Sequence, residues 1–245
     1  MCFKSWGTLT ALILLASCSV KEDRNGCPCL LSIAFENLPP GPVDYDLRGL
    51  DGSELAHGTV TRDTTLAFQV PRNGVRLTAA SGVTGGSGFH IPYGSECPPV
   101  YLYCNSVYTG HEHVLVKPVL HKSHCVLNLI LDGPPGDGKP LGVAVRGSVN
   151  GAGADSRPTY GEFRCNVSGH CLLPRQNPSD MLWLDIVMED SIVRTFALGT
   201  YLRNAGYDWT EPDLADISIE LSLSVTTLRM STNDWSVTVP FNVEI

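Results

Sequence analysis

The chain has 245 residues, of which 43% are hydrophobic and 17% charged, with 24 Gly, 17 Pro and a formal net charge of −8. A chain this apolar can bury a core and is not disordered, and its many turn-forming residues predict short elements and few long helices. The 17 basic residues are scattered along the sequence, which argues against a nucleic-acid partner and against polybasic attachment to lipid.

Residues 1–17 have the pattern of a secretion signal. The apolar stretch 9–16 (LTALILLA) is too short to span a bilayer, and Lys4 precedes it. The segment closes with LASC at 15–18, a lipobox, in which small residues admit the lipoprotein signal peptidase and the thiol of Cys18 receives diacylglycerol. An ordinary signal peptide with a chance cysteine is the alternative. We predict that residues 18–29 form a tether attached to outer-membrane lipid through acylated Cys18.

A charged patch, Lys21-Glu22-Asp23, follows the lipobox. It is similar to the surface-export signal of Bacteroidota lipoproteins. This similarity implies a lipid-anchored protein on the outer face of the outer membrane.

Alternation of apolar and polar residues dominates the remaining chain. It is longest at 217–225 and 235–245, each typical of a strand with one buried face. One short helix is expected near 197–204, with Gly206 as its C-terminal cap. Shorter strands are expected at 30–35, 43–47, 66–70, 75–80, 100–103, 113–119, 125–131, 141–149, 181–189 and 192–197.

Many short strands separated by Gly- and Pro-rich joints are typical of a β-sandwich. The length fits two sandwiches better than one, because an ordinary sandwich has about 100 residues. We therefore predict an all-β chain with an N-terminal sandwich at 30–122 and a C-terminal sandwich at 123–245. The absence of crossover helices excludes a βαβ nucleotide-binding fold.

Pro240 lies within the last predicted strand and cannot donate to a ladder of hydrogen bonds. This favours an edge strand, which offers an open row of backbone groups to another chain unless something covers it. The side chains of this candidate partner edge are Trp235, Val237, Val239 and Phe241.

Seven cysteines follow the lipobox, an odd number, so at least one is free or pairs between chains. Export makes disulfides feasible. Two pairs bracket short loops and are candidate disulfides, Cys97 with Cys104 and Cys165 with Cys171, although spacing does not fix connectivity. Cys27 and Cys29, separated by one proline, fit a zinc site poorly, and we expect structural roles for all seven.

The sequence offers little to support catalysis. No G-x-S-x-G elbow occurs, and no pair of carboxylates stands out as an acid and a base. Histidines at 111, 113, 121 and 124 are the best lead for a metal-dependent hydrolase, but no closed ligand set is present. We expect no enzyme activity, no metal, no cofactor and no small-molecule substrate.

Two stretches near the C-terminus are the most specific part of the sequence. Gly206-Tyr207-Asp208-Trp209 is followed by Pro212-Asp213-Leu214-Ala215-Asp216-Ile217, after LGTYL at 198–202. With the lipobox, the Cys27-Pro28 pair and a closing strand opened by Asp234-Trp235, they resemble the FimB/Mfa-type fimbrial anchor family of Bacteroidota.

The resemblance implies two tandem transthyretin-like sandwiches at the base of a fimbria. It also implies that fimbrial shaft subunits are partners, joined by β-strand pairing, and that the protein anchors the fimbria and limits its length. From the residues themselves, the aromatics Tyr207, Trp209, Trp183 and Trp235 are expected in the core, with Asp208 and Asp213 as turn formers.

A second hypothesis is a surface lipoprotein that binds glycan or host protein through its loops. It predicts exposed aromatic side chains there, at Tyr101, Tyr103 and Tyr108.

Overall fold

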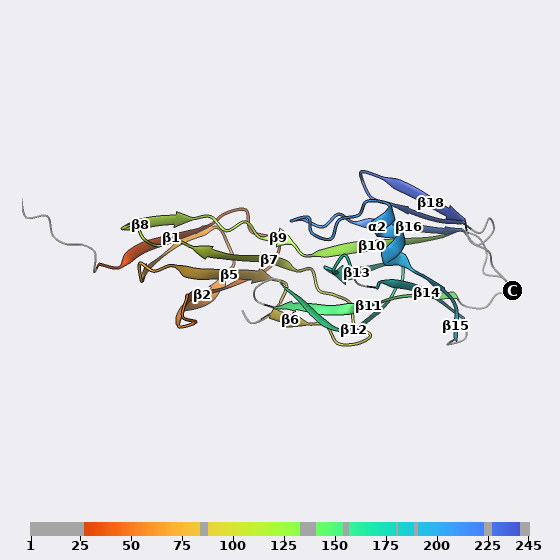
Figure 1. Cartoon of the computed structure of the whole chain (residues 1–245), viewed down its shortest axis with the longest axis horizontal. Helices are drawn as coiled ribbons and strands as arrows, with labels where there is room; N and C mark the ends of the chain where they lie inside the picture. The colour runs from red at the N-terminus through yellow and green to blue at the C-terminus, as the bar shows by residue number, and fades with distance from the viewer. Residues whose placement is uncertain are drawn as a thin grey trace, which may run out of the picture.

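The computed structural model shows an elongated molecule with two pairs of β-sheets arranged along its long axis (Figure 1). It describes residues 27–83, 88–132, 141–153, 157–179, 181–188, 191–222 and 227–240. The all-β class predicted from the sequence is confirmed. Within these ranges, no helix is long and apolar enough to cross a membrane.

The first pair of sheets encloses one hydrophobic core. A three-stranded sheet has the order β4-β1-β8, and a five-stranded sheet has the order β3-β2-β5-β7-β9. Alternate residues of β1 and β5 point inward, and Leu31, Ile33 and Leu77 are fully buried. The strands are β1 (Cys29–Phe35), β2 (Val43–Gly49), β3 (Glu54–Val60), β4 (Thr64–Val70), β5 (Val75–Ser81), β7 (Tyr101–Val107), β8 (His113–Val116) and β9 (His121–Lys122).

The second pair encloses the other core. One sheet has the order β13-β10-β16-β17-β18, and the other has the order β12-β11-β14-β15 with β6 paired to β11. Leu127, Leu184 and Ile219 are among its fully buried residues. The strands are β6 (Gly88–His90), β10 (His124–Asp132), β11 (Leu141–Gly153), β12 (Pro158–Asn166), β13 (His170–Pro174), β14 (Trp183–Met188), β15 (Ser191–Phe196), β16 (Ile217–Ser222), β17 (Thr227–Ser231) and β18 (Ser236–Pro240).

One segment of the N-terminal half packs with the second core. Strand β6 pairs with β11, and Ile91, Cys97 and Val100 are buried among residues of the second pair of sheets. This close approach needs glycine, because a Cβ at Gly151 would overlap the carbonyl oxygen of Phe89. The chain therefore touches the second core before it returns to the first sheets through β7.

The single described helix, α2 (Leu198–Asn204), ends as the sequence predicts. Gly206 adopts φ +89° and donates from its N–H to the carbonyl of Arg203 at 3.0 Å, and Tyr207 donates to Leu202 at 2.9 Å. These two bonds form a Schellman motif, which satisfies the last carbonyls of the helix.

Candidate functional site

The surface features that could meet a membrane or another chain lie at opposite ends of the molecule. Strand β1 begins at one end of the long axis, and β15 and β18 lie in the other half (Figure 1). Cys18, the predicted lipid attachment site, lies outside the described residues, eleven positions before Cys29.

The C-terminal strand β18 lies at an edge of its sheet among the described strands, as Pro240 predicts. Among the strands that the structure describes, β17 is its one partner, with Thr238 opposite Arg229. Trp235 and Val237 are partly buried and pack against the second core, whereas Ser236 and Thr238 are exposed. The side chain of Val239 and the whole of Phe241 lie outside the described part.

The opposite edge of the same sheet, strand β13, is covered by the chain itself. Cys97 donates from its N–H to the carbonyl of Leu172 at 3.2 Å, and the Glu96 carboxylate accepts from the N–H of Leu172 at 2.7 Å. The backbone of β13 is therefore engaged on that side. Of the two edges of this sheet, β18 is the one with no described strand or segment beside it.

Hydrogen bonds made by Arg175 stabilise the joint, the region where the two pairs of sheets meet. The Arg175 guanidinium donates to the carbonyl of Glu211 at 2.7 Å and of Pro212 at 2.8 Å, and also to those of Trp209 and Lys122. Five donors in a planar fork suit several acceptors at once. Arg175 thus ties the 209–212 loop to the start of the second half of the chain.

Two aspartates of the same loop hold the other side of the joint. Asp213 accepts from the N–H of Lys122 at 2.7 Å and lies 3.1 Å from Nδ1 of His121. The backbone bond lowers the pKa of Asp213 below its ordinary value, with a further contribution from His121. Asp216 accepts from the Lys122 ammonium at 2.6 Å.

The aromatic residues of this loop are core residues, as predicted. Tyr207 and Trp209 are buried with their ring centroids 4.7 Å apart, and the Tyr207 hydroxyl donates to the carbonyl of Ala215 at 2.7 Å. Asp208 forms a turn by accepting from Thr210, but Asp213 fixes the joint rather than a turn. The most specific stretch of the sequence therefore has a structural role, at the joint.

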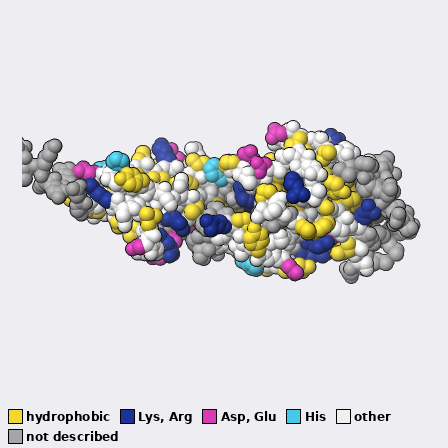
Figure 2. All heavy atoms as spheres, viewed as in Figure 1, with side chains coloured by type: hydrophobic (Ala, Val, Ile, Leu, Met, Phe, Trp, Pro, Cys, Tyr) yellow, Lys and Arg dark blue, Asp and Glu magenta, His cyan; other side chains and the backbone are white. Residues whose placement is uncertain are grey.

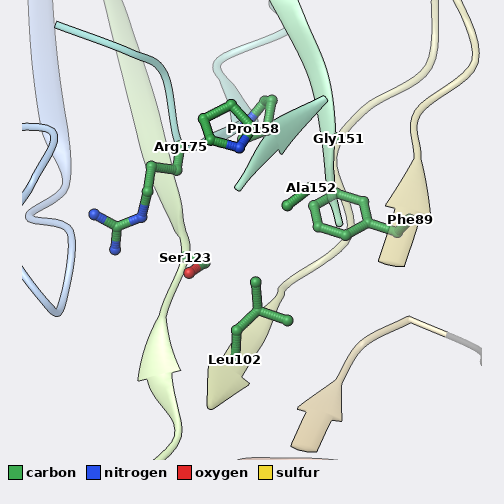
Figure 3. A pocket seen from close by; sticks show the side chains of 8 residues that line it. Phe89, Leu102, Ser123, Gly151, Ala152, Pro158 and Arg175 are labelled. Atoms are coloured by element: carbon green, nitrogen blue, oxygen red, sulfur yellow. The ribbon is translucent and has the colours of Figure 1, made fainter. Parts of the chain in front are cut away.

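A small cavity lies at the joint, among Phe89, Leu102, Ser123, Ala152 and Arg175 (Figure 3). Its volume is about 10 Å³, roughly what a single water needs. Figure 3 shows the guanidinium of Arg175 pointing away from Phe89 and Ala152. The joint is thus a packed contact and not a ligand pocket.

The histidines singled out in the sequence contact different partners in the structure. His111 packs edge-on against Tyr108, and His113 is exposed on β8. His124 is buried, and its Nδ1 lies 3.0 Å from both the backbone nitrogen and the carbonyl oxygen of Val100. Burial lowers the pKa of His124. Among the residues that the structure describes, no three His, Cys, Asp or Glu side chains come together as a metal site.

The cysteines predicted to pair have different neighbours. Cys165 of β12 and Cys171 of β13 are both buried free thiols of the second core, and each shifts the pKa of the other, lowering that of Cys165 and raising that of Cys171. Cys97 is buried near Cys125 and Cys165, and burial raises its pKa. Cys104 lies in β7, opposite Thr78 of β5 in the first pair of sheets.

Sequence reasoning placed several aromatic residues incorrectly. Trp183 was expected in the core, but it lies partly exposed on the outer face of its sheet, with the Arg146 guanidinium 5.5 Å from the ring centroid. Tyr101 and Tyr103 are partly buried, and of the three tyrosines predicted for loop recognition only Tyr108 is well exposed. Alternation alone does not tell which face of a strand meets the core.

Comparison with solved structures identifies the fold. The fimbrial anchor protein Mfa2 from Porphyromonas gingivalis has a TM-score of 0.61 and 9% identity, over 86% of this chain and 99% of that one. A candidate adhesin from Bacteroides ovatus has a TM-score of 0.61 and 14% identity, over 90% and 97% of the two chains. The chain shares their fold.

A protein from Bacteroides thetaiotaomicron, described as a candidate polysaccharide-binding protein, has the same fold. Its TM-score is 0.61 and its identity 12%, over 88% of this chain and 100% of that one. No protein-family model matches the sequence, and no curated protein matches it either. These structural similarities extend over most of this chain, so they concern both pairs of sheets.

Proposed function

We propose that this protein is an outer-membrane lipoprotein of the FimB/Mfa type that anchors a fimbria and limits its length. The observation that supports this most directly is the fold, shared with the anchor protein Mfa2 over 86% of the chain. The lipobox at Cys18 and the charged patch after it add a means of attachment at the cell surface. In this role the protein is not an enzyme.

The two hydrophobic cores support a division into two transthyretin-like domains, 30–122 and 123–245. The segment from Gly88 to Val100 belongs by packing to the second core, although it precedes the proposed boundary. Together with Arg175 and Asp213, it holds the two domains in a fixed arrangement. A rigid rod suits a protein that transmits force from a fimbria to its lipid anchor.

Shaft subunits are the proposed partners, and β18 is the proposed contact. Strand addition at an open edge gives affinity through backbone hydrogen bonds and register through alternate side chains. The edge at β18 lies in the half of the molecule away from β1, so it would face away from the membrane (Figure 1). The opposite edge is already engaged by Glu96 and Cys97.

The decisive experiment replaces Cys18 with Ala in the full chain in its native cell. We expect the protein to leave the outer-membrane fraction and the fimbriae to be shed or to grow abnormally long. A Cys27→Ser variant is the matched control, because Cys27 is exposed and lies outside the lipobox. Retention of the Cys18→Ala protein in the membrane would contradict lipidation, and normal fimbriae after deletion of the whole protein would contradict the anchoring role.

A further inference from the structure

A cleft of about 250 Å³ lies on the outer face of the sheet β12-β11-β14-β15, away from the core. Arg146 and Trp183 are cross-strand partners on its floor, whereas their neighbours Val145 and Leu184 point into the core. The side chains that line the cleft are Tyr93, Arg146, Ser148, Glu162, Met181 and Trp183. Figure 2 shows charged groups of both signs interspersed along the visible face of the molecule.

The guanidinium in this cleft is held in one orientation from below. Arg146 donates from Nε to Asp185 at 2.7 Å, and Asp185 also accepts from the Thr195 hydroxyl at 2.7 Å. The Asp185 side chain is 0% exposed and that of Arg146 is 40% exposed. Burying a carboxylate is costly unless it is paired, so this arrangement fixes Arg146 while leaving part of its fork open to the cleft.

Aromatic surface lies beside these polar groups. Tyr93 is 63% exposed and Met181 is 68% exposed, and Trp183 is partly exposed under the Arg146 guanidinium. Glu162 is exposed on β12 and supplies acceptor oxygens. The cleft therefore offers the exposed Tyr93 ring, guanidinium donors and a carboxylate within one small volume.

The position of the cleft restricts what can bind there. Strand β11 is paired on both sides, with β12 and with β14, so its backbone is engaged and cannot take an added peptide strand. Recognition must come from side chains. A volume near 250 Å³ is below the usual range for drug-sized ligands and cofactors, about 300–1,000 Å³, so the ligand must be small or be the end of a longer chain.

We propose that this cleft binds carbohydrate, one or two sugar rings of a glycan. A sugar ring has an apolar face of C–H groups, which packs on the exposed Tyr93 ring, and a rim of hydroxyls. Those hydroxyls accept from Arg146 and donate to Glu162. The site is distinct from the β18 edge and does not depend on the anchoring function.

The test measures binding of the full chain, purified in detergent, to immobilised oligosaccharides. The panel contains neutral glycans built from mannose, galactose and N-acetylglucosamine, and acidic glycans that contain uronic acid. We expect at least one of them to bind, and we expect Tyr93→Ala and Glu162→Gln each to weaken that binding roughly tenfold. Both side chains are exposed, so the variants should fold.

Tyr108→Ala is the matched control, because Tyr108 is 71% exposed and is not a cleft residue. Its affinity for the bound glycan should equal that of the unsubstituted protein. The proposal is overturned if no glycan in the panel binds at millimolar concentration, if Tyr93→Ala binds as well as the unsubstituted protein, or if Tyr108→Ala loses as much affinity as Tyr93→Ala.

Discussion

The guanidinium of Arg175 donates to the carbonyl of Glu211 at 2.7 Å, across 36 positions of sequence. The same side chain reaches the carbonyls of Trp209, Pro212 and Lys122. Burial lowers the pKa of Arg175, but its charged neighbours, Asp213 and Asp208 among them, act in the opposite direction. The loop that carries the most specific sequence pattern is therefore held in place by one partly buried cation.

Replacing Arg175 with Ala should lower the free energy of unfolding by about 2–3 kcal/mol, because hydrogen bonds to a charged group are worth about 1.5–3 kcal/mol. Chemical denaturation of the full chain in detergent measures it. Arg203→Ala is the matched control, since Arg203 is exposed and makes one bond to the carbonyl of Pro178, at 3.1 Å. That variant should change stability by no more than about 0.5 kcal/mol. Equal losses in the two variants would show that Arg175 has no special role at the joint.

Stability should decrease as the pH falls below about 6.5, in part because of His124. Burial lowers its pKa in the folded protein, and Lys122 acts in the same direction while the Val100 hydrogen bond and Asp216 oppose them. The ring of Tyr101 packs against it. A lowered folded-state pKa means that the unfolded chain binds the proton first, so this contribution is full above the unfolded pKa and is lost as the pH falls through the folded one.

The variant His124→Asn isolates this effect, because an amide oxygen can still accept from the Val100 N–H but does not titrate. Its stability should depend less steeply on pH below about 6.5 than that of the unsubstituted protein. At pH 8 the imidazole is neutral in both the folded and the unfolded protein. The difference in unfolding free energy between the two proteins at that pH therefore reports packing alone. Identical slopes in the two proteins would exclude His124 as a source of the pH dependence.

The second core should contain a disulfide between Cys165 and Cys171. Both are buried free thiols of the same core, and each shifts the other's pKa, so they are close together. An oxidised dithiol–disulfide exchange protein in the cell envelope would accept the two electrons and two protons that leave them. Closing so short a loop stabilises by about 2 kcal/mol in the chain-entropy model.

Peptide mapping of protein purified from the envelope without reductant tests this bridge. We expect a peptide that links Cys165 to Cys171, lost on reduction and in a Cys165→Ser variant. Cys27→Ser should leave it intact, since Cys27 is exposed and distant in sequence. Alkylation of both thiols without prior reduction would rule the bridge out. A linked peptide of Cys97 and Cys104 would instead support the other pairing that the sequence suggested.

Much of the fold could be predicted because alternation is a strong signal where a strand has one buried face. The expected strands at 30–35 and 75–80 correspond to β1 and β5, and Gly206 ends the helix as expected. The predicted strands do not include β3, β6, β9, β12, β13 or β17. In β3 only Val60 is buried, and β12 contains Gly161 and two charged residues, Glu162 and Arg164, so neither shows a clear apolar period.

The candidate site could be predicted less well. Pro240 predicts the edge strand correctly, because proline cannot donate to a ladder of hydrogen bonds and this property belongs to the single residue. The role of Asp213 depends on its hydrogen bond to Lys122, 91 positions away. The cleft depends on the fold bringing Tyr93 and Trp183 into the same lining. No local pattern records such long-range contacts, which is why Trp183 was assigned to the core.

A proline at position 238 should block pairing of shaft subunits with β18. Alternate residues of a strand direct their N–H groups to the same side. Thr232 donates to the carbonyl of Trp235 at 2.9 Å, so by alternation the nitrogen of Pro240, opposite Thr227, faces away from β17. The N–H of Thr238 should therefore face outward too, so Thr238→Pro removes a donor from the open row without breaking a bond to β17. Co-purification of the shaft subunit with the lipidated protein should fall roughly tenfold or more.

Thr238→Val is the matched control, since valine keeps the N–H and favours strand structure. It should retain the shaft subunit at the level of the unsubstituted protein. The stability of Thr238→Pro checks the geometry independently. Strong destabilisation would mean that the Thr238 N–H is hydrogen-bonded to β17. The outward N–H groups of β18 would then belong to the alternate residues, such as Val237. A stable Thr238→Pro protein that still retains the subunit would show that the fimbria docks elsewhere than on β18.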